Sequence, residues 1–295
     1  MSLGVAAARW PVGEPLTFGD FADRIRAAVG HATESGARVV VLPEYLSLEL
    51  AATFDDGVRA DLLGSLAAIQ VHREAWIDLF SGVARETGAV VQAGSFLLAV
   101  DGGRYRNRAD LFTPAGRHHW QDKLQLTGFE KDTGVIEPGD ELKVFDLDGP
   151  SVGIAVCYDV EFPIQVRAQR EAGARLILVP SCTDTETGAA RVRVGCMARA
   201  LENRCYVVRS VTAGAADWSP WLDLNAGDAA IHGPIDAGWP DEGLIATATG
   251  DTLWAIAELD LEALDSTRDW AEVGLDADWP EQLRPELATV HVYRD

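Results

Sequence analysis

Lysine is scarce in this chain. Only three lysines occur in 295 residues, Lys123, Lys131 and Lys143, and the other permanently basic side chains are arginines. The formal net charge is −21, and a nucleic-acid partner is not expected because phosphate binding needs a basic surface. In so lysine-poor a sequence, each lysine is a candidate for a specific role.

Long apolar runs are also absent. No stretch reaches the roughly 20 apolar residues that span a bilayer, so no membrane partner is expected. The opening residues, MSLGVAAARW, have neither the basic start nor the long apolar core of a secretory signal. Since 47% of the residues are apolar, a sizeable core can form, and we expect a soluble cytoplasmic protein.

Cysteine is rare, with four residues at Cys157, Cys182, Cys196 and Cys205. Their spacing matches no CxxC pair or zinc ribbon, so no metal site is predicted. Without an export signal, disulfides are not expected either. Buried free cysteines usually pack as small hydrophobic residues, and this interpretation applies to at least three of the four.

Strand and helix patterns alternate along nearly the whole chain, without a linker or a repeat. Short apolar runs predict strands at 4–8, 38–43, 89–100, 151–156, 175–180, 205–213 and 253–259. Apolar residues at helical spacing predict helices from a cap at 17 or 20 to about 34, and at 62–86, 163–172 and 191–203. Turns at 101–103 and 114–116 separate further strands as in hairpins. The alternation indicates an α/β fold with helices packed outside buried strands.

Three of the apolar strands are followed by candidate site residues: Glu44, Cys157 and Ser181. Sites in α/β folds gather at the carboxyl ends of strands. Position alone decides little, because a loop glutamate or a buried cysteine is commonly inert.

A cysteine, a glutamate and a lysine together form a chemically coherent set. A thiol with a pKa near ~8.5 is mostly protonated at neutral pH, and the thiolate is the attacking species. The Glu44 carboxylate can take the proton of Cys157 and later return it to a leaving amine. The Lys123 ammonium can stabilise the oxyanion that develops.

The segments around these residues resemble the Glu-Lys-Cys triad of the nitrilase-like carbon-nitrogen hydrolase family. They read VVVLPEY at Glu44, HHWQDKLQLTGFE at Lys123 and VGIAVCYDVEFP at Cys157. The similarity continues through RALENRCYVV, DEGLIA and AELDLEAL, and covers roughly residues 4–268. It implies a four-layer α-β-β-α sandwich with two mixed sheets, built from a single domain over 1–295 with a C-terminal extension. It also implies a homodimer or higher homo-oligomer, with no cofactor and no metal.

The resemblance assigns supporting roles to further residues. Glu130 corresponds to a second glutamate that holds lysine and substrate in place. The backbone N–H of Tyr158 would complete an oxyanion hole, and Asp159 would have a structural role. Cys182, at a strand end, would line the substrate pocket, with simple packing as an equal alternative.

Other candidates are less specific. His118 and His119 are expected as a polar surface pair on a strand, with at most one of them facing inward. Trp218, Trp221 and Trp239 either wall the pocket or pack in the core or a subunit interface.

The expected reaction is hydrolysis of a small linear amide to acid and ammonia through a thioester at Cys157. Hydrolysis of an N-carbamoyl amino acid or of a nitrile is the alternative. Nitrilases of the family typically have tryptophan after the nucleophile, whereas this chain has Tyr158. A catalytically silent scaffold would not need Glu44, Lys123 and Cys157 together. A papain-like protease would need a Cys/His pair, which no recognisable motif provides.

Overall fold

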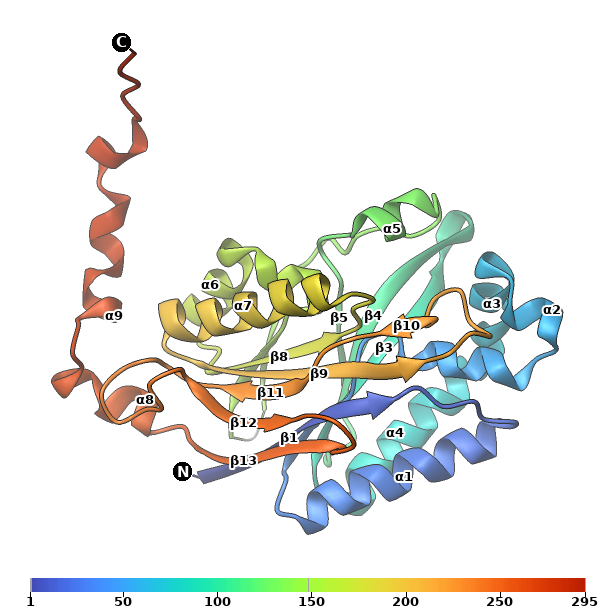
Figure 1. Ribbon diagram of the computed structural model, residues 1–295. Coiled ribbons are helices and arrows are strands. Elements are labelled where there is room, and N and C mark those ends of the chain that lie inside the picture. The colour runs from blue at the N-terminus through green and yellow to red at the C-terminus, as the bar shows by residue number, and fades with distance from the viewer. Residues whose placement is uncertain (1, 148, 295) are drawn as a thin grey trace.

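The computed structural model describes residues 2–147 and 149–294, and two mixed β-sheets form its centre (Figure 1). The first sheet contains β1 (Ser2–Pro11), β2 (Val39–Val41), β3 (Val90–Val100), β4 (Arg104–Phe112), β5 (His118–Asp122) and β13 (Trp254–Asp260). The second contains β6 (Val144–Asp146), β7 (Ser151–Ile154), β8 (Leu176–Ser181), β9 (Tyr206–Ala215), β11 (Ala229–His232) and β12 (Leu244–Ala248), with β10 (Leu224–Asn225) paired to β9.

Strand β1 joins the two sheets. Residues 2–8 pair with β13 in antiparallel orientation, and residues 5–7 also pair with β2 in parallel. The last residues, 9–11, pair in parallel with β9. The main strand order is therefore continuous, β5-β4-β3-β2-β1-β9-β8-β7-β6. The two sheets are halves of one hydrogen-bonded path that bends at β1.

The sequence of β1 reflects burial on both faces. Successive side chains of a strand point to opposite faces, so a strand covered on both sides is apolar throughout. Val5 and Ala7 belong to the core that the second sheet shares, whereas Ala6 and Ala8 belong to the core under α1 and α4. All four side chains are fully buried.

Helices cover the outer face of each sheet (Figure 1). On the first sheet lie α1 (Phe18–Glu34) and α4 (Arg73–Thr87), and on the second lie α6 (Pro163–Glu171) and α7 (Glu186–Asn203). The shorter helices are α2 (Asp56–Arg59), α3 (Leu62–Ile69), α5 (Gly128–Asp132), α8 (Ala263–Ser266) and α9 (Leu275–Asp278). The predicted four-layer α-β-β-α sandwich is confirmed.

Two helices differ from their predicted bounds. The helix expected over 62–86 is broken into α3 and α4 by a 3-10 turn at Gln70–His72. The Gln70 side chain accepts a hydrogen bond from the Ala99 N–H of β3 at 2.9 Å, which anchors the break. Helix α7 starts five residues before its predicted beginning, because the Thr185 side chain caps it.

After β13 the chain leaves the sandwich as an arm of α9 and short 3-10 turns (Figure 1). The arm contacts α6, where the guanidinium of Arg167 lies 3.9 Å from the ring centroid of Trp279. No helix within residues 2–147 and 149–294 has the length and apolarity needed to cross a bilayer.

Candidate active site

The three residues of the predicted triad follow strands whose carboxyl ends meet at one edge of the molecule. Glu44 follows β2, Lys123 follows β5 and Cys157 follows β7. Their exposed fractions are 1%, 2% and 4%, respectively. The fold therefore buries a carboxylate, an ammonium and a thiol away from bulk water.

A bulge in β3 fixes the backbone on both sides of Glu44. Gly94 in the bulge has a φ of 69°, and a Cβ at this position would lie 2.1 Å from the Pro43 carbonyl oxygen. Only glycine fits so close an approach. The next residue, Ser95, accepts a hydrogen bond from the Tyr45 N–H at 2.8 Å.

Lys123 lies between two buried glutamates. Its Nζ is 2.8 Å from Oε1 of Glu44 and 2.8 Å from Oε2 of Glu130. The Asn107 side-chain amide donates to both carboxylates, at 2.8 Å to Glu44 and 3.2 Å to Glu130. Burial acts to lower the pKa of Lys123, but the charges of Glu130 and Glu44 raise it well above its usual value. The lysine is therefore held as an ammonium.

The two glutamates differ in proton affinity. Burial raises the pKa of Glu44, with the Lys123 ammonium opposing and the charge of Glu130 adding to the rise. Burial also disfavours ionised Glu130, but the charge and hydrogen bond of Lys123, the Thr127 N–H and the Tyr45 hydroxyl lower its pKa overall. The Tyr45 hydroxyl donates to Glu130 at 2.7 Å. Glu130 is thus the fixed anion, and Glu44 is the carboxylate that more readily takes a proton.

Cys157 begins a 3-10 turn directly after β7. Its φ of 48° lies in the left-handed region, which is sparsely populated by residues other than glycine. Its thiol donates a hydrogen bond to the Cys182 carbonyl oxygen at 3.5 Å. Burial, followed by the charge of Glu44, raises the pKa of Cys157 well above its usual value, although Lys123 opposes this. The resting thiol is protonated, and the Cys182 backbone links it to the Glu44 carboxylate.

Cys182 takes part through its backbone. Its N–H donates to Oε2 of Glu44 at 3.0 Å, and its carbonyl oxygen accepts from the Cys157 thiol. Its own thiol donates to Oδ1 of Asn225 in β10 at 3.5 Å. Burial raises the pKa of Cys182 to about 12, so this thiol is protonated at neutral pH.

Tyr158 is the second residue of the turn that begins at Cys157, where the first N–H groups of a helix lack partners within it. The next residue, Asp159, accepts backbone N–H groups from Leu124 and Val156, each at 3.1 Å. Asp159 therefore ties the loop after Lys123 to the loop of the cysteine.

The histidines are not the expected surface pair. Nε2 of His118 lies 2.9 Å from Oδ1 of Asp110, and its ring stacks on Phe112. His119 lies on the other face of β5, with its ring against Phe145. Among residues 2–147 and 149–294, no group of three or more His, Cys, Asp and Glu side chains is arranged to hold a metal ion.

The three tryptophans have separate surroundings. Trp221 is buried against Tyr45, with ring centroids 5.6 Å apart, and so lies next to the candidate site. Trp218 stacks on an arginine of α2, and Trp239 packs against Tyr206 of β9. Of the three, Trp221 is the one that contacts a residue bonded to the glutamates.

Sequence reasoning missed Tyr45 and Asn107, whose side chains bind the two glutamates. A signal for Asn107 was present, because asparagine is depleted in strands and this one lies within RYRNRADLF. Tyr45 directly follows Glu44 but gave no such signal, since tyrosine is an ordinary residue of buried segments.

Comparison with known proteins gives the family. The carbon-nitrogen hydrolase family model matches residues 4–269, nearly the whole chain. This chain belongs to the carbon-nitrogen hydrolase family. The family consists of enzymes that hydrolyse carbon–nitrogen bonds in small molecules.

Two curated relatives are similar over most of this family member. The probable hydrolase YhcX of Bacillus subtilis is 31% identical over 253 residues, which cover 85% of this chain and 48% of that protein. The matched region therefore spans about half the length of that relative. Omega-amidase NIT2-A of Xenopus laevis is 26% identical over 262 residues, covering 85% of this chain and 86% of that protein.

Among solved structures, Nit3 of Saccharomyces cerevisiae, a member of the nitrilase superfamily, superposes with a TM-score of 0.73. The match has 20% identity and covers 92% of this chain and 95% of that one. At this identity the likeness supports the fold, and it agrees with the four layers described above.

Proposed function

We propose that this carbon-nitrogen hydrolase cleaves a small linear amide to its acid and ammonia, with Cys157 as nucleophile. The observation that carries the proposal is one set of contacts. The buried Cys157 thiol donates to the Cys182 carbonyl oxygen, and the N–H of the same residue donates to Glu44, which lies 2.8 Å from the Lys123 ammonium. The thiol and the ammonium both carry their protons at the start of the reaction.

In the acylation step, Glu44 accepts the thiol proton while the sulfur of Cys157 attacks the amide carbonyl carbon. The carbonyl oxygen becomes an oxyanion, which the Lys123 ammonium and the Tyr158 N–H stabilise. The carbon–nitrogen bond then breaks, and Glu44 donates its proton to the leaving nitrogen. The products of this step are ammonia and a thioester.

In the deacylation step, Glu44 takes a proton from water, and the oxygen of that water attacks the thioester carbonyl. The carbon–sulfur bond breaks, the acid leaves and Cys157 recovers its proton. Glu44 therefore acts twice as base and twice as acid, which a carboxylate of raised pKa does better than one held as a permanent anion.

Glu130 and Cys182 support this cycle in different ways. Glu130 balances the Lys123 charge without taking the proton, because its pKa is lowered. The Cys182 backbone aligns Glu44 with Cys157 through one hydrogen bond to each. We therefore assign Cys182 a positioning role in addition to the predicted place at the substrate pocket.

Nitrile or N-carbamoyl amino acid hydrolysis is the alternative within the family. The amide assignment is supported by relatives that carry amidase names, including the omega-amidase of Xenopus laevis. Matched short amides, N-carbamoyl amino acids and nitriles should be compared by ammonia release at one pH. We expect a higher kcat/KM for the amide than for the nitrile of equal chain length. A consistent preference for nitriles or carbamoyl compounds would overturn the amide assignment and leave the nucleophile in place.

We also propose that the chain acts as a single domain over 1–295 and assembles as a homodimer. The outer face of α6 and α7 supports self-association, because Ile164, Val194 and Leu201 expose 81%, 61% and 42% of their surface there. Light scattering during size-exclusion chromatography tests the assembly. A Val194→Asp variant should weaken it, whereas a wild-type monomer at all concentrations would contradict it.

A further inference from the structure

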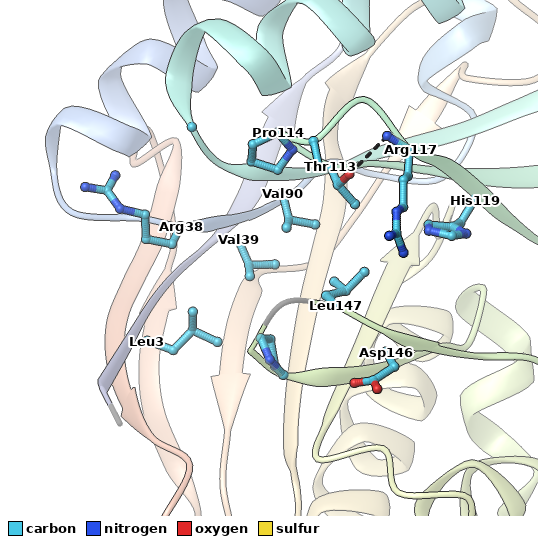
Figure 2. A pocket seen from close by; sticks show the side chains of 13 residues that line it. Leu3, Arg38, Val39, Val90, Thr113, Pro114, Arg117, His119, Asp146 and Leu147 are labelled. Carbon is cyan, nitrogen blue, oxygen red and sulfur yellow. Dashed lines mark hydrogen bonds between the residues drawn. The ribbon is translucent and has the colours of Figure 1, made fainter.

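A cavity of about 400 Å³ lies at the end of the sandwich opposite the candidate active site (Figure 2). Val39 and Val90, which line it, belong to the beginnings of β2 and β3, whereas Glu44 follows the end of β2. Pro150, immediately before β7, lines it from the second sheet. The cavity therefore opens between the amino ends of strands from both sheets and shares no lining residue with the triad.

The interior of this cavity is apolar. Figure 2 shows Val39 and Val90 in the middle of the lining, with Pro114 above them, Leu3 to the lower left and Leu147 to the lower right. The volume falls within the roughly 300–1,000 Å³ that is typical of small-molecule sites, which are mostly apolar with a few polar groups.

One exposed cationic side chain lies at the edge of this apolar space. The side chain of Arg117 runs from the turn between β4 and β5 toward Leu147, alongside His119 (Figure 2). Its guanidinium has no ion pair within residues 2–147 and 149–294. Burial, followed by the charge of Arg117, lowers the pKa of His119, so the imidazole is neutral at pH 7. The guanidinium of Arg117 thus places several N–H donors at the edge of the apolar cavity.

Arg38 and Asp146 are the other charged residues of the lining within the described part of the chain. Arg38 donates to the carbonyl oxygen of Ala37 and lies apart from the Arg117 guanidinium (Figure 2). Asp146 accepts a hydrogen bond from the Ser151 hydroxyl at 3.1 Å and is exposed. Among the residues that the structure describes, the lining thus carries two arginines and one aspartate, on a chain whose net charge is −21.

We propose that this cavity binds a small monocarboxylate with an apolar chain. The carboxylate would take the two parallel donors of the Arg117 guanidinium, a geometry that a carboxylate matches well. The apolar chain would lie between the sheets over Val39, Val90 and Leu147. This inference does not depend on the proposed amide hydrolysis.

Calorimetric titration of the whole protein with octanoate at pH 7.5 tests the proposal, with 1-octanol as the neutral probe of equal chain length. We expect one saturable octanoate site and weaker binding of 1-octanol. Arg117→Gln should weaken octanoate binding roughly tenfold, the size expected for a charged hydrogen bond. Ala115→Trp, on the exposed rim, should close the entrance and abolish binding.

The control is Arg26→Gln, which removes a surface arginine of α1 that is not part of the cavity. It should bind octanoate like the wild type, and thermal melting of every variant should show an unchanged fold. Absence of saturable octanoate binding would overturn the proposal. So would equal affinity for octanoate and 1-octanol, or unchanged affinity in Arg117→Gln and Ala115→Trp.

Discussion

The end of β2 and the short helix α5 each supply one carboxylate to Lys123, and the difference between them shows how identical side chains acquire different roles. Glu44 and Glu130 are both buried, and both lie 2.8 Å from the same ammonium. Glu130 also receives the Tyr45 hydroxyl and the Thr127 N–H, the latter through the cap of its own helix. Glu44 instead accepts the N–H of Cys182, whose carbonyl oxygen accepts from the Cys157 thiol.

The number and kind of donors therefore decide which carboxylate takes a proton more readily, and distance to the lysine does not. Donors bound to the ionised form lower a pKa, whereas burial without enough of them raises it. The opposite pKa directions of Glu44 and Glu130 follow from this balance. This difference matters for catalysis if Glu44 takes the proton of Cys157, as we propose.

The largest expected effect is therefore at the cysteine. Cys157→Ala should lower kcat by at least roughly 10⁴-fold, because the covalent route is lost. Cys196 lies within α7 and the Cys205 thiol donates to the Arg199 carbonyl oxygen, so Cys196→Ala and Cys205→Ala should retain most activity. Steady-state ammonia release and circular dichroism would be measured on all three. Near-normal turnover by folded Cys157→Ala would show that Cys157 is not the nucleophile. The proposed role of Glu44 as its base would then fall as well.

The next effect tests the two glutamates directly. Glu44→Gln should lower kcat/KM by roughly 10²- to 10⁴-fold, since it removes the proton acceptor. Glu130→Gln should lower kcat/KM less, by roughly ten- to a hundredfold, because the glutamine amide keeps the shape of the side chain but loses the charge that holds Lys123. Equal losses in the two variants, measured with one substrate, would show that the carboxylates are equivalent.

Lys123 is the shared partner, and its geometry should matter as much as its charge. Lys123→Arg should lower kcat by roughly 10²- to 10³-fold, because a planar guanidinium cannot replace a compact ammonium between two carboxylates. Lys131→Arg is the matched control on the exposed side of α5 and should be close to wild type. If Lys123→Arg kept most of the wild-type rate, charge alone would explain the lysine.

The pH dependence of kcat/KM should report Glu44. A base must be ionised to act, so activity is present above the folded pKa of Glu44 and is lost as the pH falls through it. Burial raises that pKa above 4.5, and the acid limb of the profile should therefore lie above the ordinary glutamate range. Far-ultraviolet circular dichroism at each pH would separate this loss from unfolding. An acid limb at or below the ordinary value would assign it to another group.

The smallest effect is expected at Tyr45. Tyr45→Phe removes one donor from Glu130 and keeps the ring packed against Trp221. We expect kcat/KM to fall roughly three- to tenfold, the size of one hydrogen bond. A shift of the acid limb together with this fall would show that the pKa values of the two glutamates are coupled through Lys123.

The α/β alternation could be predicted from the sequence because it depends on local patterns, whereas the four layers followed from the family resemblance. Apolar runs marked the buried strands, and Glu44 and Cys157 each follow one of them. The pairing of β1 with β9 could not be predicted in this way, since it joins residues about 200 positions apart through backbone groups that every residue type carries.

The role of the Cys182 backbone escaped prediction for the same reason. Its cysteine side chain drew attention as a pocket residue, yet the N–H and carbonyl oxygen that bond Glu44 and Cys157 exist at any residue type. His118 shows a second limit. Its partner Asp110 lies on the neighbouring strand, and the register that pairs β4 with β5 decides that contact.

The position of β1 in both sheets has a consequence for how the molecule opens. Its backbone amides are shared among β2, β13 and β9, so neither sheet can separate from the other while β1 keeps its pairing. Local fluctuations that expose the C-terminal arm leave these amides protected, whereas their exchange with solvent hydrogen requires the whole sandwich to unfold. β1 thus makes the two sheets one cooperative unit. The edge that carries Glu44, Lys123 and Cys157 therefore folds and unfolds as a whole.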